Sequence, residues 1–373
     1  MKNVLFCGPV EQADGWGGAA KDFVRALSLT SHNIATRPVY MSPHIKEYHS
    51  PLNNKIFNKR PDVVIQNVLP SMLDFQHDCK NIGLFHLETQ SIKATGWIEK
   101  INLMDEIWVP TTCARKTLLK DGVNIPVHVI PTPIDTTLLD EEPVPFGEFQ
   151  NSVIPKDDFV FYFVGEFITR KNLEALLVAF HREFHFLDPV TLFVKTHKTG
   201  MSSQDLANVI TEFSKKVVSP MRLYGDVMKH HQELYNLTTL TPQNMLHMHK
   251  HSDCLVVPSH GECLNRPLMD AMYLGSDVIV TRDAGMNDLV KDSENGWLID
   301  SHSAPCRCED PPVAYLYTGR EIWKDVDILD LQRCLSNAIK NKDSRAERAK
   351  LSKDKIVNNF SPAAVAKKME ECL

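Results

Sequence analysis

Long hydrophobic runs are missing from this sequence of 373 residues. No apolar segment reaches the roughly 18 to 20 residues that a membrane-spanning helix needs, so we expect no transmembrane segment. The amino terminus has one short apolar run that leads directly into Pro9 and acidic residues, which indicates a first strand and not a signal peptide. A basic excess is missing too, because the net charge is −6, and this argues against general binding of polyanions.

A disulfide framework is also absent from the pattern of the nine cysteines, which are scattered along the chain. Scattered cysteines are typical of reduced thiols in a reducing compartment. Cys306 and Cys308 have no second pair nearby, so we interpret them as two free thiols in a loop. The protein is therefore expected to be cytoplasmic, and peripheral attachment to the inner membrane face stays open.

The composition and pattern predict an α/β protein of two domains. Hydrophobic residues make up 43% and charged residues 24%, as in globular proteins of two ordinary domains. Short apolar runs alternate with segments of helical spacing, which favours parallel sheets covered by helices. The predicted strands are Asn3–Cys7, Pro61–Gln66, Asn81–His86, Asp105–Pro110, Val127–Ile130, Phe159–Val164, Val190–Lys195, Asp253–Val257 and Asp277–Thr281. Helices are predicted over Ala19–Leu29, over Asp205–Lys216 and between Thr111 and Gly122.

A proline-rich polar segment, Glu141–Pro155, is the predicted linker. It divides the chain into a first domain over residues 1–150 and a second over residues 151–355, and residues 356–373 are left as a closing helix. Ser361 and Pro362 suit the first two positions of such a helix.

The most informative stretch runs from Asp253 to Thr281 and predicts a strand, a loop, a short helix and a second strand. Pro267 fits the first turn of the helix, where its missing N–H costs nothing, and Gly275 fits the end. The loop between them therefore lies at the carboxyl end of a strand and the amino end of a helix, where phosphorylated ligands bind in open α/β sheets.

Two carboxylates, Glu262 and Asp270, stand beside this phosphate-binding position. Carboxylates repel phosphate but accept hydrogen bonds from hydroxyl groups, so together they suit a ligand with phosphates in the middle and sugars at its ends. A nucleotide sugar is such a ligand. The alternative is that Asp270 complements its helix dipole and that Glu262 is a solvated loop residue.

This stretch resembles the signature of retaining glycosyltransferases with the GT-B fold, of the group 1 type (glycosyltransferase family 4). In that family a Glu, seven residues and a second Glu bracket a Gly-rich turn and a Pro. Glu262, Pro267 and Gly275 match, whereas Asp270 replaces the second Glu, and Cys263 and Asn265 replace the usual glycines on either side of Leu264.

The resemblance extends to other positions that would contact the donor. Lys171, with its neighbour Arg170, falls on the family's diphosphate-binding cations, and Gly285 falls on a turn near the donor. His86 lies at the carboxyl end of a predicted strand, where a histidine of family members often contacts the donor sugar; the alternative is a strand-end histidine without a ligand. Gly17 and Gly18 precede the first helix, either as a ligand-binding turn or as an ordinary connection.

The resemblance implies two Rossmann-like, doubly wound domains that face each other across a cleft. It also implies a hexosyltransferase-type enzyme that transfers a sugar from a UDP- or GDP-linked donor to an acceptor hydroxyl. Configuration would be retained, and neither a metal nor another cofactor would be bound. His86, Glu262 and Lys171 would be the catalytic residues. The donor would be bound by Gly17, Gly18, Arg170, Lys171, Glu262, Cys263, Leu264, Asn265, Asp270 and Gly285.

The acceptor is left open by the sequence, as a glycan, a lipid-linked precursor, a protein or a modified base of phage DNA. Basic residues at Lys195–Lys198 and Lys229–His231 are candidates for a nucleic-acid groove. The alternatives to a transferase are a non-catalytic nucleotide-sugar-binding protein and an epimerase on the same scaffold. The histidine-rich run His247–His251 lacks a Cys, Asp or Glu at ligand spacing, so we do not predict a metal site there.

Overall fold

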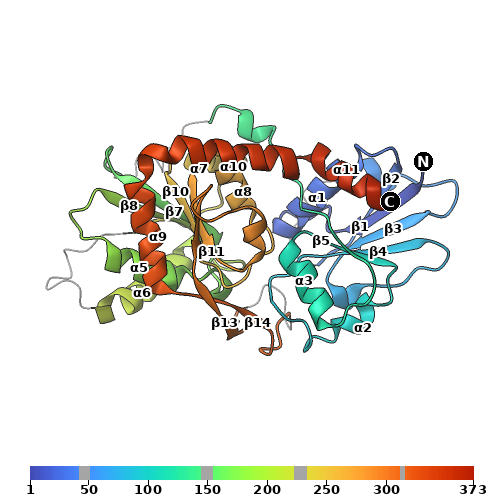
Figure 1. Ribbon diagram of the computed structural model, residues 1–373, viewed down its shortest axis with the longest axis horizontal. Helices are drawn as coiled ribbons and strands as arrows, with labels where there is room; N and C mark the ends of the chain where they lie inside the picture. The colour runs from blue at the N-terminus through green and yellow to red at the C-terminus, as the bar shows by residue number, and fades with distance from the viewer. Residues whose placement is uncertain (42–50, 144–153, 222–232, 311–315) are drawn as a thin grey trace.

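The computed structural model describes residues 1–41, 51–143, 154–221, 233–310 and 316–373. These residues form two lobes, each built on a six-stranded parallel sheet (Figure 1). Most of the predicted linker lies outside the described residues, as do Lys229–His231.

The first lobe contains a sheet with the strand order β2-β1-β3-β4-β5-β6. Because parallel neighbours need crossover connections, α-helices or 3-10 turns lie between successive strands. The strands are β1 Asn3–Gly8, β2 Asn33–Pro38, β3 Val63–Asn67, β4 Lys80–Leu84, β5 Glu106–Val109 and β6 Val127–Val129. The helices are α1 Gly15–Leu27, α2 Trp97–Ile101 and α3 Thr112–Asp121, with 3-10 turns η1 Pro51–Asn54, η2 Pro70–Met72 and η3 Leu138–Asp140. The predicted cap of α3 is confirmed, since the Thr111 side chain accepts from Ala114 N–H.

The second lobe repeats the plan with the order β12-β11-β10-β7-β8-β9. The strands are β7 Phe159–Glu166, β8 Val190–His197, β9 Leu234–Asn236, β10 Cys254–Val257, β11 Asp277–Thr281 and β12 Trp297–Ile299. The helices are α5 Leu173–Glu183, α6 Ser203–Val218, α7 Pro242–Lys250, α8 Arg266–Leu274 and α9 Ile328–Lys340, with 3-10 turns η4 Thr169–Lys171, η5 Ser219–Met221, η6 Gly285–Asp288 and η7 Lys342–Ser344. The predicted strands of this lobe are confirmed to within two residues at each end.

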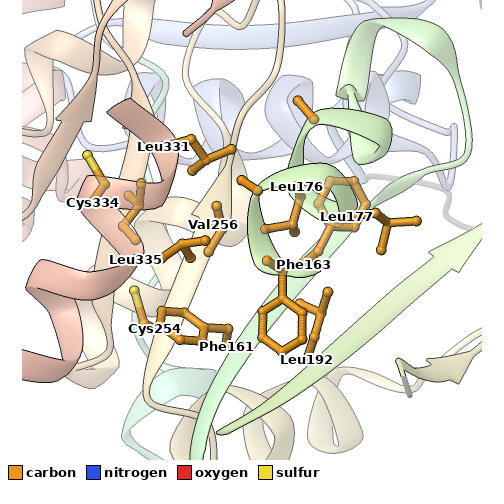
Figure 2. Packing of buried hydrophobic residues seen from close by; sticks show 14 of the residues in the cluster. Phe161, Phe163, Leu176, Leu177, Leu192, Cys254, Val256, Leu331, Cys334 and Leu335 are labelled. Atoms are coloured by element: carbon orange, nitrogen blue, oxygen red, sulfur yellow. The ribbon is translucent and has the colours of Figure 1, made fainter. Parts of the chain in front are cut away.

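Apolar side chains fill the space between the second sheet and its helices. Figure 2 shows Phe161 and Val256 from the sheet against Leu176 of α5 and Leu335 of α9. All four are fully buried, and both strands are apolar on both faces, as expected of parallel strands covered on each side. This packing holds the carboxyl ends of β7 and β10 side by side.

Besides the short strands β2, β9 and β12, two larger features were not predicted from the sequence. One is an antiparallel hairpin, β13 Ser301–Pro305 and β14 Ile322–Val326, which lies beside the gap between the lobes (Figure 1). The other is the long helix α10 Arg345–Phe360, whereas the closing helix, α11 Pro362–Cys372, begins at the predicted Ser361 and Pro362. Helix α11 packs on the first lobe, where Val365 and Met369 join the core cluster beneath α1.

Candidate functional site

A cleft of about 670 Å³ lies between the two lobes. Its walls are formed largely by segments that follow the carboxyl ends of strands in both sheets, the usual ligand position in open α/β folds. The first lobe contributes the segments after β1, β3, β4 and β6, and the second contributes those after β7, β8, β9 and β10. Seven of the predicted site residues line the cleft: His86, Arg170, Lys171, Glu262, Cys263, Leu264 and Asn265.

The turn between β10 and α8 is rigidly built. Asn265 caps α8 because its side chain accepts from Leu268 N–H at 3.0 Å. Gly285 stabilises the turn, because its N–H donates a hydrogen bond to the Glu262 carbonyl at 3.1 Å. A Cβ on Gly285 would lie 2.2 Å from the Cys263 carbonyl oxygen, so only glycine fits there. Gly285 does not itself line the cleft and acts through the turn that it supports.

A cluster of four charged side chains occupies one wall of the cleft. Glu262 forms ion pairs with Lys171 and, at 3.1 Å, with Arg170. Arg170 also reaches across to the first lobe, where its guanidinium lies 3.1 Å from a carboxylate oxygen of Glu88. Ser259 donates to Glu262 at 3.1 Å. Glu262 is 6% exposed, which rules out a solvated loop residue.

Burial and ion pairing shift the pKa values of Glu262 and Arg170 in opposite directions. Burial alone raises the pKa of Glu262, but Lys171 and Arg170 outweigh it and hold the pKa at about 2. Burial likewise lowers the pKa of Arg170, whereas Glu88 and Glu262 raise it above its ordinary value. Glu262 and Arg170 are therefore both charged at neutral pH.

Glu88 is a site residue whose role the sequence did not reveal. Besides Arg170, it accepts a hydrogen bond of 2.5 Å from the Tyr317 hydroxyl. The lobes approach closely here, because a Cβ on Gly261 would lie 2.1 Å from the Glu88 carbonyl oxygen. Gly261 is thus a glycine that the interlobe contact requires.

His86 faces the cleft from the first lobe. Its Nε2 lies 3.0 Å from the Thr132 hydroxyl, and its ring packs 6.2 Å from that of Phe23. Burial lowers the pKa of His86 to about 4, so the imidazole is neutral at pH 7. A neutral imidazole can hydrogen-bond a sugar hydroxyl without attracting an anion.

Gly17 and Gly18 were expected to precede the first helix, but α1 begins at Gly15 and includes both; neither lines the cleft, although Asp14, Gly15 and Trp16 do. The Gly17 N–H already donates to the Asp14 carboxylate at 2.9 Å, and the Gly18 N–H donates to the Asp14 carbonyl at 2.9 Å. A Cβ on Gly17 would lie 2.0 Å from the Gln12 carbonyl oxygen. Packing within the turn accounts for this glycine.

Asp270 also lies outside the residues that line the cleft. Burial raises its pKa to about 6, against the effect of Arg266, and nearby Asp22 adds to the rise. Arg266 belongs to the second lobe and forms a 2.8 Å ion pair with Asp22 of α1 in the first. Asp270 follows the first turn of α8, so complementing the helix dipole does not explain it.

Two further motifs of the sequence are the histidine-rich run His247–His251 and the pair Cys306 and Cys308. His249 is buried, and its Nδ1 lies 2.8 Å from the Tyr162 hydroxyl. The rings of His247 and His251 lie 4.1 Å apart. All nine cysteines are free thiols, Cys306 and Cys308 included. Within the described residues no group of three or more His, Cys, Asp or Glu side chains could hold a metal ion.

None of the described helices combines the length and the apolar character that crossing a membrane demands.

Comparison with known proteins places these features in a family context. Residues 229–305 match the model of the family described as glycosyl transferases group 1. No match was found among curated proteins.

Several solved structures share the whole architecture. Sucrose-phosphate synthase from Thermosynechococcus elongatus superposes with a TM-score of 0.71 at 14% identity, over 100% of this chain and 98% of that one. A glycosyltransferase from Rickettsia africae gives a TM-score of 0.68 at 12% identity, over 100% and 97%. Anabaena HepE in complex with UDP-glucose gives 0.67 at 12% identity, over 100% and 99%. The predicted GT-B fold is thereby confirmed.

Proposed function

We propose that this protein is a glycosyltransferase that moves a sugar from a nucleotide sugar to an acceptor hydroxyl. The observation that carries the proposal is the cleft itself. Cations on Lys171 and Arg170, a buried carboxylate on Glu262 and a neutral His86 line one cavity at the carboxyl ends of two parallel sheets. The match of residues 229–305 to group 1 glycosyl transferases supports it.

The proposed division of labour follows from charge. Lys171 and Arg170 are assigned to the donor diphosphate, where fixed cations stabilise the charge of the leaving group without a bound metal. Glu262 is assigned to hydroxyls of the transferred sugar, and it would exchange its ion pair for these when the cations meet phosphate. Cys263, Leu264 and Asn265 shape the turn beneath.

The remaining assignments rest on the resemblance. Retention of configuration, a hexosyl group and a UDP- or GDP-linked donor are proposed on that basis, and HepE, a structure of the same fold, was solved with UDP-glucose. Asp270 is proposed as the acceptor of ribose hydroxyls on the resemblance alone, since it does not line the cleft.

A transfer and hydrolysis assay with UDP- and GDP-linked hexoses tests the proposal. Transfer or slow donor hydrolysis that survives EDTA is expected, with the anomeric configuration of the product read by NMR. Loss of activity with EDTA, restored by Mg²⁺ or Mn²⁺, would contradict the metal-independent mechanism. Binding without turnover would indicate a non-catalytic nucleotide-sugar-binding protein, and conversion of the donor sugar would indicate an epimerase.

His86→Ala gives the matched variant for this assay. Because His86 is assigned to the sugar and not to the nucleotide, the variant is expected to lose turnover while it keeps affinity for the bare nucleoside diphosphate. Equal losses of both, or no loss, would assign His86 a structural role.

A further inference from the structure

Lys195 is a buried cation at the carboxyl end of β8. Its side chain lines the cleft, and the residue is 6% exposed. Its ammonium group donates a long hydrogen bond of 3.5 Å to the Thr196 carbonyl, and no described carboxylate forms an ion pair with it. A buried cation without a carboxylate partner lowers stability. The contacts among the described residues therefore do not explain why a lysine is buried at position 195.

The titratable groups around Lys195 are a histidine, a second lysine and one carboxylate. His197 lies two residues further on the same strand, so both side chains are on one face of β8 and both line the cleft. Lys171 approaches from the neighbouring β7 side: the pKa of His197 is lowered first by burial and then by Lys195 and Lys171. Glu166 is the opposing carboxylate, and it accepts from the Thr199 N–H at 3.0 Å.

The charged cluster on the adjacent wall does not supply a net positive charge. Arg170 and Lys171 are balanced there by Glu88 and Glu262, each within ion-pair distance. A diphosphate that enters this wall meets two carboxylates as well as two cations. A further cation is needed for the cleft to attract it, and Lys195 lines the same cavity.

We propose that Lys195 binds a phosphate oxygen of the nucleotide donor and is a determinant of the cleft's affinity for the diphosphate. This inference rests on the proposed function. Lys195 belongs to β8, and so it lies outside both the turn between β10 and α8 and the loop that holds Lys171. Burial lowers the pKa of Lys195 to about 8, so the side chain is still mainly protonated at pH 7. A nearby phosphate would favour that charged form.

Calorimetric titration of Lys195→Met and Lys195→Gln with UDP, GDP and inorganic pyrophosphate tests the proposal. A charge-assisted hydrogen bond is lost, so affinity for pyrophosphate and for the bound nucleotide should fall by about ten- to a hundredfold. Affinity for uridine or guanosine should stay unchanged. Without ligand, Lys195→Met should melt no lower than wild type, because an unpaired buried charge is removed.

Lys198→Met is the matched control. Lys198 follows the same strand but forms a 2.7 Å ion pair with Asp310 and does not line the cleft, so pyrophosphate affinity should not change. Equal pyrophosphate affinity in wild type and both Lys195 variants would overturn the assignment. Loss of nucleoside binding with pyrophosphate binding intact would overturn it too. A wild-type protein that binds neither nucleotide nor pyrophosphate would overturn the proposed function together with it.

Discussion

Glu262 is proposed to have different partners without and with a bound donor. Without a ligand its carboxylate pairs with Lys171 and Arg170, so the two buried charges of Glu262 and Arg170 and the half-buried charge of Lys171 are all paired. The proposed donor would take over both cations and release Glu262 to sugar hydroxyls. Asp270, just after the first turn of α8, has Arg266 and Asp22 as its charged neighbours instead. The two carboxylates of the signature thus have different surroundings.

Substitution at these two carboxylates should separate the ends of the donor. Glu262→Gln is expected to spare the nucleoside diphosphate, because its cations stay in place, and to lose about ten- to a hundredfold in affinity for the sugar nucleotide or in transfer. Asp270→Asn should weaken both ligands, since both carry the ribose. Calorimetry with both ligands decides this. If Glu262→Gln loses the bare nucleotide as badly as Asp270→Asn, the division is wrong.

At the scale of elements, helix α7 places a polar side chain, His249, inside the core of the second lobe. His249 packs edge-on against Tyr162 of β7, and the Tyr162 hydroxyl also donates to Ser276 at 3.1 Å. The Nε2 of His249 has no partner among the described residues. Burial lowers the pKa of His249 to about 3, so the folded protein holds this imidazole neutral.

This buried imidazole predicts acid sensitivity. The ordinary pKa of His is near 6.5, so below that pH the unfolded chain binds a proton that the folded chain refuses, and stability falls until about pH 3. From pH 7 to pH 5 the contribution of His249 amounts to a loss of about 2 kcal/mol in the free energy of unfolding.

Urea unfolding at several pH values measures the effect. His249→Gln should show a shallower fall between pH 7 and pH 5 than wild type, whereas His251→Gln, at the exposed end of the same helix, should follow wild type. Parallel curves for wild type and His249→Gln would refute the assignment.

At the scale of the whole molecule, contacts across the cleft set how the lobes face each other. Arg170 pairs with Glu88, Arg266 pairs with Asp22, and the Gln90 N–H donates to the Ile322 carbonyl of the β13–β14 hairpin at 2.6 Å. Helix α11 adds an apolar contact beside α1 of the first lobe (Figure 1). The charged contacts are the ones that a diphosphate can disturb.

Glu88→Gln should therefore change both affinity and shape. Removal of one carboxylate beside Arg170 takes away a charge that repels phosphate, so pyrophosphate should bind several-fold more tightly. Loss of the interlobe ion pair should increase the radius of gyration of the free protein in X-ray scattering. Glu99→Gln, an exposed carboxylate on α2, is the control. Weaker pyrophosphate binding together with an unchanged radius would contradict this account.

The local sequence pattern was sufficient to predict the fold class and part of the candidate site. Apolar runs ended by Gly, Pro or Asn predicted most of the strands, because parallel strands buried on both faces leave a continuous signal. The loops after them hold Lys171, Glu262 and His86, and the fold brings all three into one cleft. The short β2, β9 and β12 and the hairpin were not predicted, since segments of three to six residues carry little periodicity.

Tertiary structure alone decided which charges meet. Glu88 and Arg170 are far apart in the sequence, and their pairing depends on how two separately folded sheets approach, which no local pattern encodes. The same holds for Lys195, whose burial without a described carboxylate partner follows from its place between β7 and β9. By itself the sequence determined the sheets and the loops at their ends, because strand and turn propensities act over a few residues. Long-range packing determined the electrostatics of the cleft.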